Sequence, residues 1–403
     1  MKQQRPYVFM LLFVSAHFVH HLLTAIILPL LPMIRDSFEL SYSQSGIVMS
    51  AFALSYGFSQ LPAGWIADRI GSRYMLLIGI SGVGIAGFLV GISTGYVSLL
   101  VLLVLLGLAG GAYHPSASPL ISASVPETKR GKAIGLHIFG GSSSHLAAPL
   151  LAVFIAGFLG WRGSFLIISI PVIIIGAVLF ILLNQYQVTA RKVRDPADAT
   201  GRQKLRLAPE IIIFLVATSA LGASVGSMLP FVTLYIVDSF GFTEQVAALF
   251  LTLFYAVTVV SAPVGGLLAD RLNIRVLFSV VALAAGPAVL LMGMAMHWVM
   301  IALLLFSLAV ISSFRMIMSE TFFVSRVPAA HRSTVLGIYF FAGAEASGII
   351  SPILGAAIDQ WGFTWAFGSL GIVLLIVASA CMLLLSRFDR GMRHPRPEQA
   401  AAK

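Results

Sequence analysis

The sequence is poor in the residues on which soluble enzymes and disulfide-stabilised proteins depend. Its 403 residues include one cysteine, Cys381, which excludes a disulfide framework and a cysteine-based metal site. Only 10% of the residues are charged, against about a quarter in soluble globular proteins. The sequence also lacks a phosphate-binding loop ending in Gly-Lys-Ser/Thr and the zinc-protease motif His-Glu-x-x-His. We therefore expect neither an enzyme nor a self-contained ATP-driven pump, and no cofactor.

Acidic residues are scarcer than basic ones, which gives a net charge of +10. The basic residues are dispersed over short loops between apolar runs, so we expect no nucleic-acid partner. Of the 25 Lys and Arg residues, 22 lie in the set of loops that includes both chain ends. The opposite set holds only Arg35 and Arg162, and Arg315 lies inside an apolar run. By the positive-inside rule, both termini are expected in the cytoplasm of a bacterial inner-membrane protein.

Long apolar runs are abundant, and 59% of the residues are hydrophobic. In a bilayer each backbone polar group must be satisfied within its own segment, so these runs are expected to form helices. The predicted fold is an all-α membrane protein of two six-helix bundles, at 1–184 and 209–386, with a cytoplasmic linker at 185–208 and a tail at 387–403. The expected helices are 7–31, 44–65, 75–94, 97–124, 132–157, 164–184, 209–237, 244–268, 275–296, 298–325, 334–358 and 364–386.

An internal repeat divides the chain into two equivalent units. The stretch at 64–73 (GWIADRIGSR) returns 202 residues later at 266–275 (GLLADRLNIR), with Gly, Ala, Asp and both Arg at identical spacing. The same offset relates Val125-Pro126 to Val327-Pro328 and Gly160 to Gly362. One unit of about 200 residues is therefore expected to occur twice.

The repeated turn Gly-x-x-x-Asp-Arg-x-Gly-x-Arg, two six-helix units and a basic central loop resemble the major facilitator superfamily. His17-Phe18, the segment Leu28-Pro29-Leu30-Leu31-Pro32, and Gly111-Ala112-Tyr113-His114-Pro115 resemble the fosmidomycin-resistance branch of its exporters. The resemblance implies alternating access around one central site, lined by the first, fourth, seventh and tenth helices.

The repeated turn is expected to act as a conformational latch. A carboxylate at a helix end, beside arginines, can accept hydrogen bonds from an Arg fork or from a facing helix N-terminus. Such a latch would hold the two halves together on the cytoplasmic side. The alternative is that the turn only fixes topology. The latch residues are Gly64, Asp68, Arg69, Gly71, Arg73, Gly266, Asp270, Arg271 and Arg275.

Polar groups at mid-depth are costly in a bilayer and commonly functional. In the first half they are mostly histidines: His17, His20, His21, His114, His137 and His145. In the second half they are Arg315, Glu345 and Glu320, and the repeat relates Tyr113 to Arg315. We expect Arg315 to clamp an anion with its permanently charged fork. Alternatives are a structural ion pair between Arg315 and Glu345, a transition-metal site of histidines, and ordinary helix packing.

These observations predict a secondary active transporter of a small organic, anionic or amphipathic solute, exported against proton entry. Proton-coupled import of an organic anion or a metal chelate, and a membrane sensor that does not transport, are the alternatives. The expected partners are the solute, protons and the lipid bilayer, and the protein is expected to be a monomer. Predicted solute-binding residues are Arg315, Tyr113, His114, His17, His21, Thr24, Met228 and Tyr339, predicted proton-coupling residues are Glu345, His114, Glu320 and His137, and no metal ligand is assigned.

Overall fold

The protein is helical throughout the part of the chain that the structure describes. The computed structural model describes residues 6–125, 129–186, 188, 207–328 and 331–387. Its helices are α1 (Pro6–Ala25), α2 (Ile27–Phe38), α3 (Tyr42–Ile70), α4 (Ser72–Leu77), the π-helical η1 (Ile78–Gly82), α5 (Val83–Gly91), α6 (Tyr96–Gly110), α7 (Tyr113–Ser124), α8 (Arg130–Gln185), α9 (Pro209–Phe240), α10 (Glu244–Arg271), α11 (Ile274–Met292), α12 (Trp298–Arg326) and α13 (Arg332–Ser386).

Within the described residues, nine helical stretches are long and apolar enough to cross a membrane. Two of them, in α8 and α13, each contain two helices joined at a corner and so count twice. The 29-residue α3 is long enough to be a further span, because its rise is about 43 Å. The all-α, multi-span fold is therefore confirmed. Most of the expected linker at 185–208 and all but Arg387 of the expected tail lie outside the described residues, and the division into two domains stays a prediction.

Glycine forms the corners in α8 and α13. Gly160 has φ 67° and ψ 172°, and Gly362 has φ 75° and ψ 172°. Side-chain-bearing residues rarely adopt this conformation, so both positions require glycine. The two residues are related by the 202-residue offset, and their backbones turn in the same way. The repeat in the sequence is thus also a repeat in backbone geometry.

Proline breaks two of the spans at mid-depth. A proline lacks the amide hydrogen of the regular helical bond and clashes with the carbonyl four residues earlier. Pro29 follows the break between α1 and α2, and Pro115 follows the break between α6 and α7. Thr24 and His114 therefore lie beside irregular backbone, where side chains of neighbouring helices can approach.

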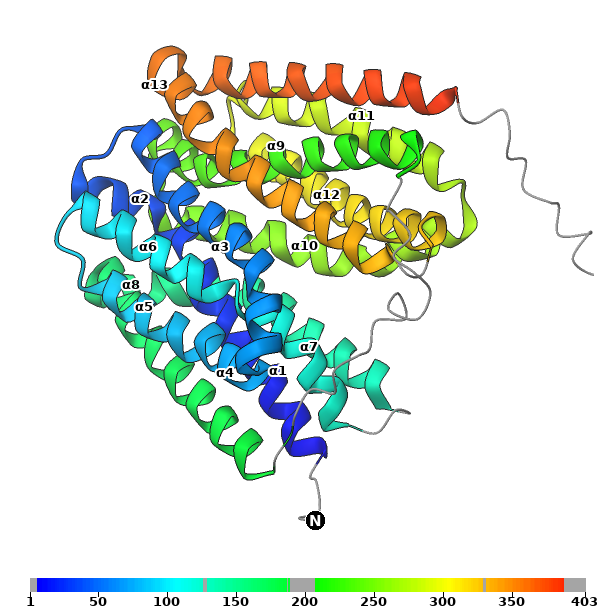
Figure 1. Ribbon diagram of the computed structural model, residues 1–403. Coiled ribbons are helices and arrows are strands. Elements are labelled where there is room, and N and C mark those ends of the chain that lie inside the picture. The colour runs from blue at the N-terminus through cyan, green and yellow to red at the C-terminus, as the bar shows by residue number, and fades with distance from the viewer. Residues whose placement is uncertain (1–5, 126–128, 187, 189–206, 329–330, 388–403) are drawn as a thin grey trace, which may run out of the picture.

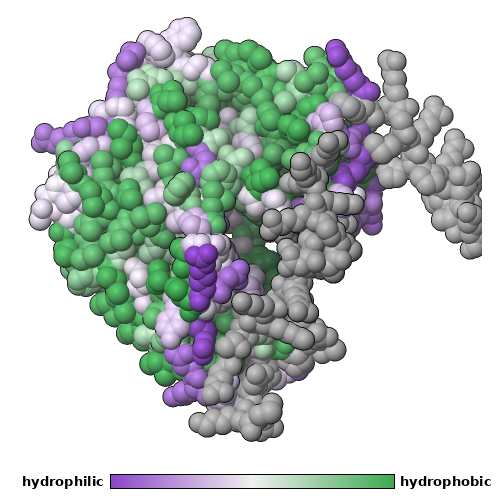
Figure 2. All heavy atoms as spheres, in the orientation of Figure 1, coloured by the Kyte–Doolittle hydropathy of each residue, from purple (hydrophilic) through white to green (hydrophobic). Residues whose placement is uncertain are grey.

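The helices before and after the linker form two groups that meet at one end and spread apart at the other (Figure 1). The groups touch mainly where α3 lies along the first part of α13 and where α8 lies along α10. Hydrophobic side chains cover much of the visible surface, and a recess opens between the groups beside the grey segments (Figure 2). We call the end near residues 35–43 the joined end, and the end near residues 64–73 the spread end.

Candidate functional site

An ion pair between the two halves closes the joined end. Arg35, near the end of α2, donates to Asp238 of α9 from both terminal guanidinium nitrogens, and its Nη2 lies 2.9 Å from Oδ1. The hydroxyl of Tyr42 donates to the same carboxylate at 2.7 Å. Asp359 of α13 accepts from the backbone amides of Tyr42 and Ser43, at 2.9 Å each. A carboxylate from the second half thus caps the N-terminus of α3 in the first half, where the helix dipole favours an anion.

Below this ion pair, small residues let α3 and α13 approach closely. A Cβ added to Gly46 would lie 2.5 Å from the backbone oxygen of Ser351 and 2.8 Å from Cα of Pro352. One turn deeper, the hydroxyl of Ser50 donates to the backbone oxygen of Gly348. Because helix association in lipid depends on close packing and interhelical hydrogen bonds, these contacts extend the closure of the joined end into the protein.

At the spread end, the predicted latch is not engaged. Asp68 and Asp270 are exposed, and neither forms an ion pair with any residue that the structure describes. The guanidinium of Arg69 lies over its neighbour Trp65, with Cζ 3.4 Å from the ring centre. Arg275 is buried and binds Glu210 of α9 at 2.6 Å, within its own half. Gly64, Gly71, Arg73, Gly266 and Arg271 also belong to these two turns.

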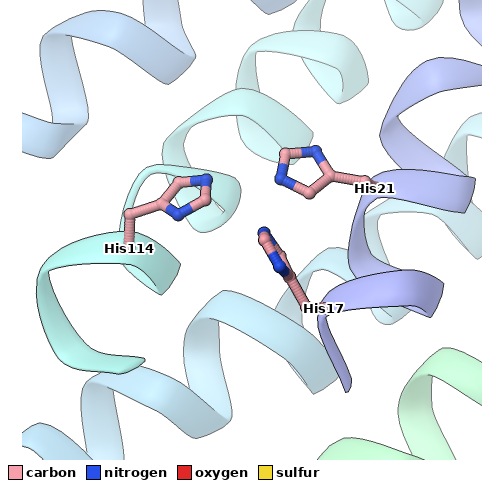
Figure 3. Close-up of side chains that lie close together, drawn as sticks. All are labelled: His17, His21 and His114. Carbon is pink, nitrogen blue, oxygen red and sulfur yellow. The ribbon is translucent and has the colours of Figure 1, made fainter. Parts of the chain in front are cut away.

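The predicted histidines of the first half converge on one place, although they come from three helices. His17 and His21 lie on α1, His114 on α7, and the side chains face one another (Figure 3). One nitrogen from each of these three rings lies within 4.8 Å of the other two. His137 of α8 stacks on His17 with ring centres 3.9 Å apart. Together with His20 and His145, these side chains form what we call the histidine cluster.

Backbone carbonyls fix the orientation of the most buried rings. Nδ1 of His17 lies 2.6 Å from the carbonyl oxygen of residue 137, and Nδ1 of His20 lies 2.8 Å from that of Gly79. A carbonyl only accepts, so each Nδ1 carries the hydrogen and each Nε2 retains a lone pair. Gly79 belongs to the π-helical segment η1, where the regular hydrogen-bond ladder is interrupted. Nε2 of His17 is buried and has no hydrogen-bond partner among the described residues.

Thr24 and Tyr113 support the histidine cluster rather than open onto a cavity. The hydroxyl of Thr24 donates to the backbone oxygen of His20 at 3.1 Å. Tyr113 is fully buried and stacks on His20 with ring centres 4.4 Å apart. His145, by contrast, reaches the second half and stacks on Tyr255 of α10 at 5.4 Å.

In the second half, Arg315 of α12 is half-buried and held by neutral groups. Its Nη1 donates to the hydroxyl of Tyr339 at 2.9 Å, and to the hydroxyl and carbonyl oxygens of Thr218 at 3.4 Å. Its Nε has no partner among the described residues. Gly222 of α9 provides the space for the guanidinium, because a Cβ there would lie 3.0 Å from Nη1.

The expected alternative of an ion pair between Arg315 and Glu345 is not formed. Glu345 points to α3, where a side chain at Gly57 would collide with its carboxylate, and Oε1 is buried without a hydrogen-bond partner among the described residues. Glu320, five residues after Arg315, attracts the guanidinium but forms no ion pair with it in the described structure. Similar depth along two helices does not fix the directions in which their side chains point.

Met228, a predicted solute-binding residue on α9, is fully buried and does not line an open space.

The ion pair at the joined end was not predicted, although the sequence carried a signal for it. Residues 34–38 read IRDSF, and residues 236–240, which follow at the 202-residue offset, read IVDSF. Asp238 is therefore the repeat equivalent of Asp36, the neighbour of Arg35. Arg35 also binds Asp36 at 2.7 Å, so it bridges two equivalent carboxylates. A comparison of the repeated polar residues at the joined end would have identified Asp36 and Asp238 as equivalent carboxylates near Arg35.

Comparison with known proteins agrees with this architecture. The family model described as Major Facilitator Superfamily matches residues 13–234 and again residues 212–403. The probable sulfoacetate transporter SauU of Cupriavidus necator is 27% identical over 81% of this chain and 78% of its own length. The multidrug resistance protein MdtG of Rahnella is 27% identical over 93% of this chain and 91% of its own length. The match to MdtG of Escherichia coli, 29% identical, spans 62% of this chain and 63% of that protein.

Solved structures share the fold at lower identity. A bacterial homologue of the human lysosomal transporter Spinster, in an inward-facing and occupied conformation, is 19% identical with a TM-score of 0.77, over 96% of this chain and 98% of that one. A POT family transporter in complex with 5-aminolevulinic acid is 16% identical with a TM-score of 0.79, over 94% of this chain and 96% of that one. At these identities the likeness concerns the fold alone.

Proposed function

Because the chain belongs to the Major Facilitator Superfamily and is a secondary transporter, we propose that it exports a small organic anion or anionic amphipathic solute in exchange for protons. The solute would bind between the two halves, and alternating closure of the joined end and the spread end would expose it to one side of the membrane at a time. The termini would lie in the cytoplasm, as the distribution of Lys and Arg indicates.

The observation that carries this proposal is the environment of Arg315. A guanidinium is permanently charged, and a charge inside a membrane protein is costly unless an opposite charge compensates it. The hydrogen-bond partners of Arg315 are the neutral groups of Thr218 and Tyr339. A carboxylate, sulfonate or phosphonate of the solute would supply a negative charge in direct contact with Arg315, which none of the described residues provides, and would bind the fork with two hydrogen bonds.

The relatives support both parts of the proposal. Sulfoacetate, in the name of one relative, is an organic anion. Multidrug resistance, in the name of the others, favours export. The resemblance of His17-Phe18 and Tyr113-His114-Pro115 to the fosmidomycin-resistance branch also favours export, and membership of that branch stays a prediction.

Glu345 is the carboxylate we assign to proton coupling. Its position against Gly57 places it where α3 and α13 meet, so its charge state affects the contact between the halves. An ionised carboxylate without a hydrogen-bond donor is unfavourable there, and a protonated one packs more readily. Protonation of Glu345 would therefore favour the conformation with α3 and α13 together. Glu320, His114 and His137 are the other candidates for proton transfer.

The experiment is counterflow and binding of radiolabelled organic anions, sulfoacetate first, with the purified protein in proteoliposomes. Arg315→Ala should abolish specific binding. Arg315→Lys should weaken it by about 1–3 kcal/mol, because the charge remains while the planar fork is lost. The matched control is Arg162→Lys. Arg162 and its partner, the backbone oxygen of Ser93, both lie in the first half, away from Arg315. Glu345→Gln should retain binding and counterflow but lose uphill transport driven by a pH gradient.

Four results would each contradict a part of the proposal. Normal affinity for every transported anion in Arg315→Ala would show that the arginine is structural. Unchanged proton-driven accumulation in Glu345→Gln combined with His114→Ala would remove both residues from coupling. Movement of the solute in the same direction as the protons would favour the alternative, proton-coupled import of an organic anion or a metal chelate. A protein that binds but moves none of the anions would favour a sensor.

A further inference from the structure

The arrangement of the histidine cluster has the features of a transition-metal site. We propose that His17, His21 and His114 bind one divalent transition-metal ion, such as Zn²⁺, through one ring nitrogen each. His114 is also a candidate for proton transfer in the proposed function, but this inference does not require that function, and its test measures metal binding rather than transport.

The first support is convergence. The three candidate ligand nitrogens lie within 4.8 Å of one another, and they come from two helices that pack together. Around a tetrahedral zinc ion with bonds of about 2.0–2.1 Å, ligand nitrogens lie roughly 3.4 Å apart. Rotations of the side chains that move each nitrogen by about 1 Å would therefore suffice. The sequence spacing of these histidines showed no metal motif, because the ligands meet only through the packing of α1 against α7.

The second support is an oriented, unused lone pair. His17 is 6% exposed, and its Nδ1 hydrogen is directed to the carbonyl of residue 137. This is the arrangement that fixes metal-binding histidines in proteins, where the ring nitrogen opposite the metal donates to a carbonyl or a carboxylate. The remaining nitrogen, Nε2, is buried and points into the cluster without a hydrogen-bond partner among the described residues.

The third support is that the other two rings have no competing hydrogen-bond partner. His21 and His114 are half-buried, and neither ring forms a hydrogen bond with any described residue. Neutral imidazoles are good ligands for zinc, copper, nickel and cobalt, whereas magnesium and calcium require oxygen ligands. Three neutral ligands leave the charge of the ion uncompensated and one tetrahedral position free. Water, hydroxide or an anionic group of a solute would occupy that position.

Cobalt is the probe for the experiment, because its visible absorption reports both binding and tetrahedral geometry. The full-length protein, purified without a polyhistidine tag, is titrated with Co²⁺ and then with Zn²⁺ as a competitor. We expect one equivalent of Co²⁺ to produce an intense visible band, and one equivalent of Zn²⁺ to remove it. His17→Gln, His21→Gln and His114→Gln should each weaken binding at least tenfold.

Two further variants keep the test decisive if a glutamine variant folds poorly. His114→Cys replaces one ligand by a thiolate, so it should retain binding and add a sulfur-to-cobalt charge-transfer band in the near ultraviolet. His297→Gln changes an exposed histidine at the start of α12 and should leave the titration unchanged. Absence of the visible band in the unaltered protein overturns the proposal. So does a band that persists when His17, His21 and His114 are all replaced by glutamine.

Discussion

The two ends of the interface between the halves differ in how they are held. At the joined end, Arg35 and Asp238 form a bidentate ion pair, and Asp359 caps the N-terminus of α3. At the spread end, Asp68 and Asp270 are exposed without an ion pair in the described structure. The repeat relates the two segments at each end, 34–38 to 236–240 at the joined end and 64–73 to 266–275 at the spread end, so each end carries equivalent parts of the two halves. In the opposite conformation we expect the roles to reverse.

The largest effect is expected from preventing close approach at the joined end. Gly46→Ala places a methyl group against the backbone of α13, where no side chain can move aside. Overpacking of this kind costs about 1–3 kcal/mol, which corresponds to a shift of roughly 5- to 150-fold in the balance between the two conformations. The reporter position is Leu54 of α3, which lies against Gly348 of α13. The shift is measured as faster thiol labelling of Leu54→Cys from the joined end, in a Cys381→Ser background.

The matched control is Gly343→Ala on α13. A Cβ at Gly343 would meet no atom within 4 Å, so labelling should change little. Equal labelling of the Gly46 and Gly343 variants would show that the approach of α3 and α13 does not close this end.

A smaller effect is expected from the ion pair itself. Asp238→Asn removes the charge that binds Arg35 and weakens the bond from Tyr42. Hydrogen bonds to charged groups contribute about 1.5–3 kcal/mol, and partial exposure to solvent reduces this to roughly 1–2 kcal/mol. The same labelling assay should show faster modification of Leu54→Cys. Asp36→Asn is the control, since it removes a carboxylate from the same arginine without separating the halves. An Asp36 variant that matched the Asp238 variant would mean that Arg35 acts within its own half.

The smallest effect is expected at the spread end. Asp68 forms no ion pair with any described residue in this conformation, so Asp68→Asn should leave the stability of this conformation unchanged. It should weaken only the opposite conformation, by less than about 1 kcal/mol, because exposed charges contribute little. Labelling of Gly343→Cys from the spread end should rise slightly, and Asp270→Asn should act in the same direction. Lost transport with unaltered labelling would give Asp68 a role other than that of a latch.

The fold was predictable from the sequence, whereas the contacts between helices were only partly so. An apolar run of about 20 residues in lipid must form a helix, because its backbone polar groups have to be satisfied within the segment. The 202-residue offset related Gly160 to Gly362, where the structure has equivalent corners. Which way a side chain points from its helix depends on packing against other helices. For that reason Glu345 was expected near Arg315 and instead faces Gly57.

The histidine cluster shows the same limit. The sequence identified its members as functional candidates, because polar residues at mid-depth are rare. It placed His17, His21 and His114 around one central site but did not single them out as a group of three, since their close approach follows from the break at Pro115 and from the packing of α7 against α1. The π-helical segment at Gly79, which presents a carbonyl to His20, has no recognisable sequence pattern either.

The contact between Arg35 and Asp238 is also expected to respond to dissolved salt. This pair borders water, whereas the glycine contacts between α3 and α13 lie within the interface and carry no charge. The Debye length is about 30 Å at 0.01 M ionic strength and about 8 Å at 0.15 M, so salt on that side of the membrane weakens only the charged part of the closure. Because the two side chains are in contact and only 14% and 23% exposed, we expect this screening to be partial, with a dilute medium holding the joined end closed somewhat more firmly than a saline one.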